Sequence, residues 1–590
     1  MTQTLKHIKR KGISDTLNSW LRKNWQTLAL LLFCLTPLRW FKANYVAHAP
    51  EERGYLDYSF LFEKFLYGWS SQINNGAPAA PFDHIVLYPV GIFYKLAGLL
   101  GLPDFLIQRL FIVFIFSLTV YSIYKLSSYL VKDRTVGVLC SLFYLTSMYS
   151  TSTVFYTAKM LQMLLTPAFF YIFLRYLETN GKFYLVLNFI VLWSFQAVFS
   201  NIANAIVAFF AYFLAWVYYY TTRTGLASLK KDIGRLLVFS LTFIPVFYNV
   251  AVLYYFSMFK RYQEFTDIWF SQITFLKTAS YLNIFEYFKG AWWTRTQDNL
   301  WMGFYDNLGV RVTALLLTVF LFTGTVFKKS NKRNAAENLF WLAVFTLFVF
   351  LIHGASRPMG FVYQWMFDHL PFFSIFREPW AKFVPMLIFS ATMLAAFSLK
   401  AFQGYKRLVY PTVCALLFLH SYPYFSRDYV SHINTEKVHS DNLFPEYYSY
   451  ARIWSNLHKD DNVISIPIAY YSLYLYRWYD HFIGNHYDYG GMPDIIYHFN
   501  SIGRTAINYY EHRQLFRNYD NRLLSIFNVD YVLNQADLDV TSYASSLDSL
   551  VDLASLNGAI EEKPVRQFGK LFLYKVKDEF YLPRVFAEAD

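Results

Sequence analysis

The chain has 590 residues, of which 55% are hydrophobic, 21% are aromatic and 16% are charged. Soluble domains usually carry about a quarter charged residues, so this composition argues against a soluble protein. The formal net charge of +13 does not indicate nucleic-acid binding, because the basic residues gather in short segments beside apolar runs, where they anchor a protein against anionic lipid.

Apolar stretches of about 20 residues, the length that crosses a bilayer as a helix, recur from Leu28 to Tyr424. They predict a polytopic α-helical membrane protein. We expect about eleven membrane-spanning helices, at residues 25–41, 106–124, 136–151, 160–177, 183–200, 202–221, 236–256, 309–327, 338–353, 384–400 and 408–424.

Short basic connectors lie between these stretches and are separated from one another by even numbers of spans. Their residues are Lys125, Lys132 and Arg134; Arg223, Lys230, Lys231 and Arg235; Lys328, Lys329, Lys332 and Arg333; and Lys400, Lys406 and Arg407. Basic short loops stay in the cytoplasm, so all four connectors fit one orientation. We therefore predict a plasma (inner) membrane protein with a cytoplasmic N-terminus and an extracytoplasmic C-terminus.

Three domains follow from this pattern: a basic cytoplasmic N-terminus at 1–24, a membrane domain at 25–424, and a small extracytoplasmic α/β domain at 425–590. The membrane domain has three long outward loops, at 42–105, 259–308 and 354–383, and loops of such length are commonly functional. In the last domain the pattern predicts strands at 462–468, 528–533 and 570–576 and helices at 447–458 and 543–554.

Motifs of soluble enzymes are absent from the sequence, which has no Walker A, dinucleotide-binding, nucleophile-elbow or zinc-protease motif. The three cysteines, Cys34, Cys140 and Cys414, lie in apolar stretches, so we expect no disulfide framework in the tail. The histidines form no cluster with ligand spacing, and no compact carboxylate cluster is visible. We therefore predict no cofactor and no obligatory metal ion.

Candidate catalytic groups are charged residues in the outward loops. Asp57 begins an amphipathic stretch, where a carboxylate acts as a general base toward a sugar hydroxyl, caps a helix or is a solvated loop residue. Arg377 and Lys382 lie beside the predicted membrane surface, where they either bind a phosphate headgroup or snorkel to the interface. Trp292 and its aromatic neighbours either stack on a sugar ring or form an interfacial aromatic belt.

Several short motifs resemble a known family. In the first outward loop these are Leu56-Asp57, Gln72 with Asn75-Gly76, Tyr88-Pro89-Val90-Gly91 and Gln108-Arg109, and in the third loop residues 376–383 read FREPWAKF. They resemble GT-C membrane glycosyltransferases, especially bacterial α-(1→3)-arabinofuranosyltransferase-type enzymes of the cell wall, and related YfhO-type membrane proteins. The tail sequences 528–533 (NVDYVL) and 573–576 (LYKV) resemble the outward domain of the same groups.

The resemblance implies an inverting glycosyltransferase with a GT-C-like membrane domain and a polyprenyl-phosphate-linked sugar donor. By motif, the catalytic base is Asp57, and the cations on the donor phosphate are Arg377 and Lys382. Further residues expected to bind substrate are Glu52, Gln72, Asn75, His84, Trp292, Arg295 and Glu378. The sugar is expected to be a pentofuranose such as arabinofuranose. The acceptor would be a glycan, lipid or protein of the cell envelope, at the outer face of the membrane. The chain ends soon after one small domain, which argues against arabinan as the acceptor.

Two other functions are compatible with this architecture. A lipid or glycan transporter or flippase would carry charges inside its membrane spans and broken helices in paired halves. A non-enzymatic membrane assembly factor would use the fold without consuming a donor. Neither intramembrane charges nor paired broken helices stand out in the predicted spans, which favours the glycosyltransferase.

Overall fold

The computed structural model describes residues 25–40, 45–47, 69–70, 77–78, 90–147, 157–200, 202–246, 304–305, 307–326, 332–371, 373–376, 378–426, 435–437, 446–458, 461, 463–466, 475–476, 521–526, 529–539 and 552–580. The chain falls into two compact units. The membrane unit comprises Met1–Lys42, Arg109–Tyr248 and Gln263–Ile433. The tail unit comprises Ala43–Gln108, Asn249–Tyr262 and Asn434–Asp590.

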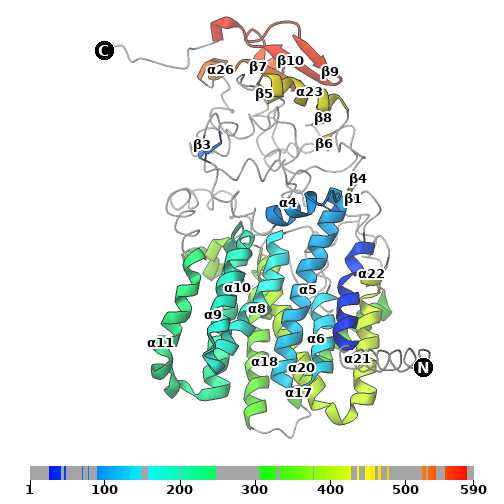
Figure 1. The fold of residues 1–590 in the computed structure, drawn as a ribbon, viewed down its shortest axis with the longest axis vertical. Helices are drawn as coiled ribbons and strands as arrows, with labels where there is room; N and C mark the ends of the chain where they lie inside the picture. Colours follow the sequence, from blue (N-terminus) through cyan, green and yellow to red (C-terminus); the bar gives the residue numbers. More distant parts are fainter. Residues whose placement is uncertain are drawn as a thin grey trace, which may run out of the picture. The chain divides into compact units, whose positions relative to one another are not determined.

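The membrane unit is a bundle of apolar helices (Figure 1). A first helix spans Trp25–Arg39. The other helices are α5 (Asp104–Val131), α6 (Arg134–Leu145), α8 (Thr157–Thr179), α9 (Lys182–Ser194), α10 (Ile202–Tyr219), α11 (Leu229–Ser240), α17 (Leu308–Val326), α18 (Lys332–His353), α19 (Gly360–His369), α20 (Pro379–Ala401), α21 (Lys406–His420) and α22 (Tyr422–Phe425).

Six of the described helices are long and apolar enough to cross a membrane, namely α5, α8, α10, α17, α18 and α20. Each predicted span overlaps a described helix, but the remaining ones are covered by shorter helices. A multi-pass membrane protein is therefore supported, while the number of eleven spans stays a prediction. The short helix α19 was not predicted, because it lies within residues 354–383, which the sequence pattern assigns to the third outward loop.

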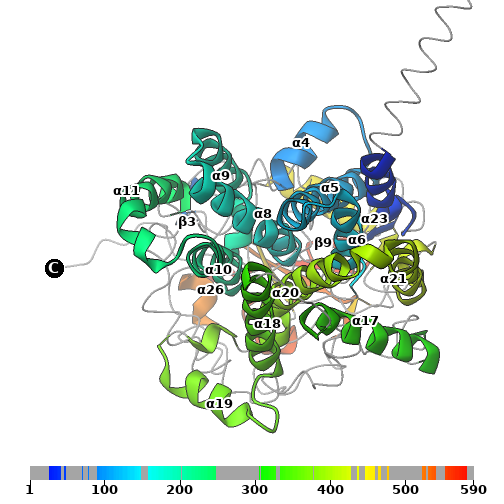
Figure 2. The ribbon, with the colours of Figure 1, turned by 90° about the horizontal axis from the view of Figure 1, so that it is seen from below.

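The centre of the membrane unit is α20, which is buried from Pro379 to Leu399. It packs against α6, α8, α10, α17 and α18 (Figure 2). A helix that is apolar on every face is stable only when other helices cover it. Small residues let α17 approach closely. A Cβ atom added at Gly324 would lie 2.8 Å from the backbone nitrogen of Ser398. The Ser398 hydroxyl accepts from the Gly324 N–H and donates to the Leu321 carbonyl, each at 2.9 Å.

The four basic connectors meet at one end of the membrane unit, here called the basic end. Lys400, near the end of α20, lies close enough to Lys132, Arg223 and Glu337 to interact with their charges. Lys132 follows α5, Arg223 follows α10, and Glu337 lies near the start of α18. The end of α5, the residues after α10, the start of α18 and the end of α20 therefore share one end of the unit, as the even spacing of the connectors predicts. The membrane face that the basic end meets stays a prediction.

The tail unit contains a mixed sheet in the order β5-β7-β10-β9. Its strands are β5 (Val463–Ile466), β7 (Tyr531–Gln535), β9 (Arg566–Phe568) and β10 (Leu571–Lys575). β5 runs parallel to β7, and the other neighbours are antiparallel. The remaining described elements are α4 (Ile92–Gly98), α23 (Glu446–Leu457), α26 (Arg522–Ile526) and the strand pairs β1 (Tyr45–Ala47) with β4 (Thr435–Lys437), β2 (Trp69–Ser70) with β3 (Ala77–Pro78), and β6 (Leu475–Tyr476) with β8 (Leu538–Asp539).

A small C-terminal sheet is thus present as predicted. The predicted strands overlap β5, β7 and β10, and the predicted helix 447–458 matches α23. β9 was missed, because its sequence Arg-Gln-Phe is short and mostly polar and becomes a strand through its pairing with β10. Most of the predicted helix 543–554 lies outside the described residues. All three cysteines are free, as expected.

Candidate functional site

The start of α20 is the described part of the predicted site. Predicted site residues outside the described part of the chain are Glu52, Asp57, Gln72, Asn75, His84, Trp292, Arg295 and Arg377. Lys382 and Glu378 are described, and they lie at the end of the membrane unit opposite the basic end, here called the site end. The meeting of Asp57, Arg377 and Lys382 in one pocket therefore stays a prediction.

Lys382 lies in the first turn of α20. Glu378 is the N-cap residue and Pro379 follows it, a position that suits proline because an N–H there has no partner within the helix. The Lys382 N–H donates to the Glu378 carbonyl oxygen at 3.2 Å. Lys382 is 6% exposed, whereas a snorkelling lysine keeps its ammonium group in water. The described geometry therefore does not favour the snorkelling alternative.

The electrostatics at this helix start favour an anion. The N-terminus of a helix carries a partial positive charge, and the cationic residue Lys382 belongs to the first turn of α20. Since two positive contributions coincide here, a phosphate group is a chemically suitable ligand.

Gln162 of α8 fixes the position of this helix start. It is fully buried, and its side-chain nitrogen donates to the Lys382 carbonyl oxygen at 2.9 Å. No described residue forms a hydrogen bond with its Oε1 atom. Buried polar atoms without a partner are rare and call for an explanation, such as strain, water or a ligand. The sequence analysis missed Gln162, although a lone glutamine inside a predicted span is a recognisable signal.

Other buried polar side chains also lie at the site end. They include Arg109 at the start of α5, Asn204 at the start of α10 and His353 at the end of α18. His353 Nε2 is hydrogen-bonded to the Arg357 carbonyl oxygen. Polar side chains inside a membrane bundle are expensive and usually face its interior or a cavity. Together with the buried Lys382, these side chains make the site end the candidate functional region.

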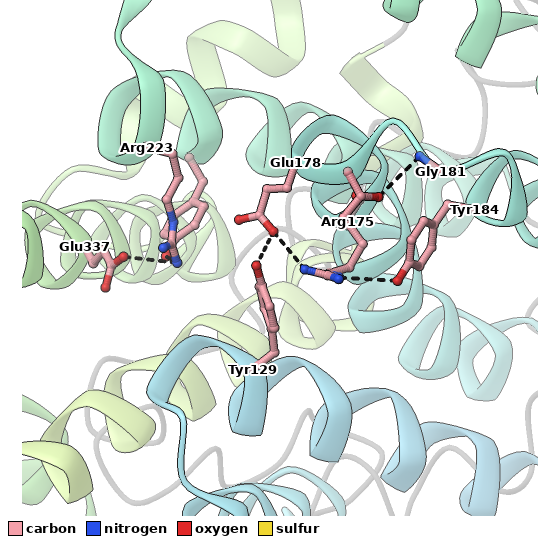
Figure 3. Close-up of polar contacts among 9 residues, drawn as sticks. Tyr129, Arg175, Glu178, Gly181, Tyr184, Arg223 and Glu337 are labelled. Atoms are coloured by element: carbon pink, nitrogen blue, oxygen red, sulfur yellow. Dashed lines mark hydrogen bonds and ion pairs between the residues drawn. The ribbon is translucent and has the colours of Figure 1, made fainter.

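At the basic end, two arginines form ion pairs with carboxylates on the described helices (Figure 3). Arg175 Nη1 of α8 lies 3.2 Å from Glu178 Oε2, and the Tyr129 hydroxyl of α5 donates to the same carboxylate oxygen. Arg175 Nε donates to the Tyr184 hydroxyl of α9 at 3.3 Å. The guanidinium carbon of Arg175 also lies 4.4 Å from the centre of the Tyr129 ring. Tyr129 and Tyr184 thereby connect this ion pair of α8 to α5 and α9.

A second ion pair joins the end of α10 to α18 (Figure 3). Arg223 Nη2 lies 3.1 Å from Glu337 Oε1 and donates to the Tyr218 hydroxyl at 3.1 Å. The Arg223 and Glu337 side chains are 15% and 3% exposed. Both pairs lie in or beside apolar helices, and of their four residues only Arg223 was recognised from the sequence, as part of a basic connector. Their position at helix ends and their pairing fit a structural role better than the transport path of the alternative function.

In the tail unit, a buried carboxylate anchors α23. The Tyr447 hydroxyl donates to Asp537 Oδ2 at 2.7 Å, and Asp537 is fully buried. Burial and the neighbouring Asp537 carboxylate raise the pKa of Tyr447 above its usual value. Within the described ranges, no group of three or more His, Cys, Asp or Glu side chains is placed to hold a metal ion.

The fold of this chain is similar to that of solved structures of a mycobacterial enzyme. The arabinofuranosyltransferase AftD from mycobacteria matches with a TM-score of 0.58 and 12% sequence identity over 94% of this chain and 40% of that chain. A mutant of the same enzyme matches with a TM-score of 0.57 and 12% identity, over 95% of this chain and 42% of that one. The chain shares the fold of these enzymes. The predicted resemblance is thereby confirmed at the level of the fold.

The likeness has a limited extent. This chain spans about two fifths of the length of the AftD chains that it matches. No protein-family model matches the sequence, and no curated protein does.

Proposed function

We propose that this chain is a membrane glycosyltransferase that transfers a sugar from a polyprenyl-phosphate donor to an acceptor of the cell envelope. The observation that carries the proposal is the fold shared with the arabinofuranosyltransferase AftD at a TM-score of 0.58. The buried Lys382 at the start of α20 supports it, because a cation beside a helix N-terminus suits the phosphate group of such a donor.

In the proposed reaction, an acceptor hydroxyl attacks the anomeric carbon of the donor sugar. The bond between this carbon and the phosphate oxygen breaks, and the lipid phosphate leaves with the electron pair. Lys382 and Arg377 offset the charge that develops on the phosphate. Asp57 takes the proton of the attacking hydroxyl. The hydroxyl attacks the face of the sugar opposite the departing phosphate in a single displacement, so the configuration at the anomeric carbon inverts. The lipid phosphate is already a competent leaving group, so the reaction needs no nucleotide.

The remaining predicted residues would position the two substrates. We assign contacts with the sugar and the acceptor to Glu52, Gln72, Asn75, His84, Trp292, Arg295 and Glu378. A pentofuranose such as arabinofuranose is the first donor sugar to test, because AftD is an arabinofuranosyltransferase. The proposal includes no obligatory metal ion and places the reaction at the outer face of the plasma membrane, where the predicted outward loops lie.

The test uses the full-length chain, purified in lipid nanodiscs, with polyprenyl-phosphate arabinofuranose and other polyprenyl-phosphate sugars as donors. Product and remaining donor are measured by mass spectrometry. We expect Asp57→Asn to lower the transfer rate by about 10²- to 10⁴-fold, the usual contribution of a general base. The matched control is Glu51→Gln in the same loop, which should leave the rate within about threefold of the unmodified chain.

The alternative functions give different results in the same system. A transporter or flippase would move the lipid-linked sugar across the bilayer without consuming it, and an assembly factor would do neither. If no donor is consumed with any sugar and acceptor class, the enzyme proposal fails. If transfer proceeds equally well with Asp57→Asn, the assignment of the base is wrong.

A further inference from the structure

A groove at the basic end of the membrane unit lies outside the proposed catalytic site. It has a volume of about 620 Å³ and lies between the first helix, the second half of α5 and the start of α6. Its apolar wall includes Leu30, Leu31 and Val120. From Ser117 to Lys132 the groove follows α5 for about four helical turns, or roughly 22 Å. This length exceeds the thickness of one leaflet's hydrocarbon layer, which is about 15 Å.

The basic end of this α5 groove is positively charged. Lys125, Lys132 and Arg134 line it there, together with a single carboxylate, Asp133. The Asp133 Oδ1 atom accepts hydrogen bonds from the backbone N–H groups of Thr135 at 2.8 Å and Val136 at 3.3 Å. Asp133 therefore serves as the N-cap of α6. Three cations against one engaged carboxylate leave the groove mouth net positive.

The backbone at the groove mouth supports a functional role for Lys132. Lys132 directly follows α5 and has a φ of 60°. This is a left-handed conformation, which glycine or asparagine usually adopts at the end of a helix. Lysine is strained there, yet its side chain is exposed at the groove mouth. Local strain that persists in a folded protein is often linked to a functional requirement. Here the requirement would be a cation at this place.

We propose that the α5 groove binds an anionic phospholipid of the leaflet that the basic end meets. The lipid phosphate would lie between Lys125, Lys132 and Arg134. One acyl chain would lie against Leu30, Leu31 and Val120. The apolar wall distinguishes this ligand from a soluble phosphate, and the excess positive charge distinguishes it from a zwitterionic lipid. This site is separate from the donor site proposed at the other end of α20.

The charge requirement can be tested by native mass spectrometry of the full-length chain with phosphatidylglycerol or phosphatidylcholine of identical acyl chains. The groove variant combines Lys132→Gly with Arg134→Gln, where glycine accepts the left-handed conformation and so preserves the fold. The control variant combines Lys182→Gln with Lys230→Gln, two exposed lysines outside the groove, and removes the same charge. We expect phosphatidylglycerol binding to weaken at least tenfold in the groove variant and less than twofold in the control.

The apolar requirement can be tested with Leu31→Trp, which narrows the groove at a half-exposed position without changing its charge. We expect it to weaken phosphatidylglycerol binding at least fivefold while leaving the melting temperature unchanged. Equal binding of both phospholipids, or equal losses in the groove and control variants, would overturn the proposal. So would binding of soluble glycerol phosphate as tight as that of the lipid. Stronger binding of a polyprenyl phosphate than of phosphatidylglycerol would assign the groove to another lipid.

Discussion

Cationic side chains have different surroundings at the two ends of the membrane unit. At the basic end, Arg175 and Arg223 lie within 3.2 Å of carboxylates on described helices, and each also donates a hydrogen bond to a tyrosine hydroxyl. At the site end, Lys382 lies buried in the first turn of a helix, where the helix dipole has the same sign as its charge. The first arrangement joins helices, whereas the second suits an anionic ligand.

This difference predicts that substitutions at the basic end lower stability, whereas substitutions at the site end lower activity. Removing a partner from the paired end should cost folding free energy, because an unpaired charge would remain buried. Removing the cation at the site end should cost activity instead, because its charge is proposed to act on the substrate.

The largest effect is expected from Lys382→Gln, which removes the ammonium group and keeps a side chain of similar length. It should lower the transfer rate by about 10²- to 10³-fold, the usual cost of losing one electrostatic stabiliser of a transition state. Lys382→Arg should retain part of the activity. The matched control is Lys400→Gln at the other end of the same helix, with a rate within about threefold of the unmodified chain. Comparable losses at both lysines would contradict the assignment.

At the basic end, Glu337→Gln should lower the free energy of unfolding by about 3–5 kcal/mol, because it leaves Arg223 buried without its carboxylate partner. Thermal unfolding in detergent measures this loss. The double variant Arg223→Met with Glu337→Leu should recover most of the stability, since an apolar pair of similar volume needs no compensation. A double variant less stable than Glu337→Gln would show that the pair itself, rather than the unpaired charge, determines the cost.

The contact between α17 and α20 should be sensitive to a single methyl group. Gly324→Ala forces a Cβ atom to within 2.8–2.9 Å of Ser398 atoms and should cost about 1–3 kcal/mol by overpacking. Gly234→Ala in α11 provides the control, because a Cβ atom there meets nothing within 4 Å and alanine favours helix. Melting temperatures of the two variants should therefore move in opposite directions.

The smallest effect is expected in the tail unit. Tyr447→Phe removes the hydrogen bond to Asp537 and should lower the free energy of unfolding by about 1–2 kcal/mol. Tyr450→Phe, which loses a bond to the exposed Glu446, should cost less. Folding raises the pKa of Tyr447. The stabilisation that neutral Tyr447 gives to the folded state is therefore complete below about pH 10 and falls as the pH rises above about 10. If the unfolding curves of the two variants are the same at pH 7, the bond between Tyr447 and Asp537 does not stabilise the fold more than the exposed bond of Tyr450 does.

The amino-acid sequence alone was enough to predict the helical membrane class and the gathering of the basic connectors at one end of the bundle. A span of apolar residues favours a helix whatever its neighbours are, because the bilayer leaves its backbone no other partners. The even spacing of the basic connectors likewise predicted that Lys132, Arg223, Lys400 and the start of α18 share one end. Strands β5, β7 and β10 followed from short apolar runs, whereas β9 exists only because β10 pairs with it.

Only the tertiary structure decided which polar side chains are buried and what they contact. Lys382 was predicted as a site residue, but the sequence did not decide whether it binds phosphate or snorkels to the interface. Gln162 was not predicted, although its side-chain amide donates a hydrogen bond to the carbonyl oxygen of Lys382, 220 residues away in the sequence. The pairing of Arg223 with Glu337 and the groove beside Lys132 were not predicted either. Hydropathy is a local property of the chain, whereas burial and pairing depend on which helices pack together, so these features emerge only when the bundle assembles.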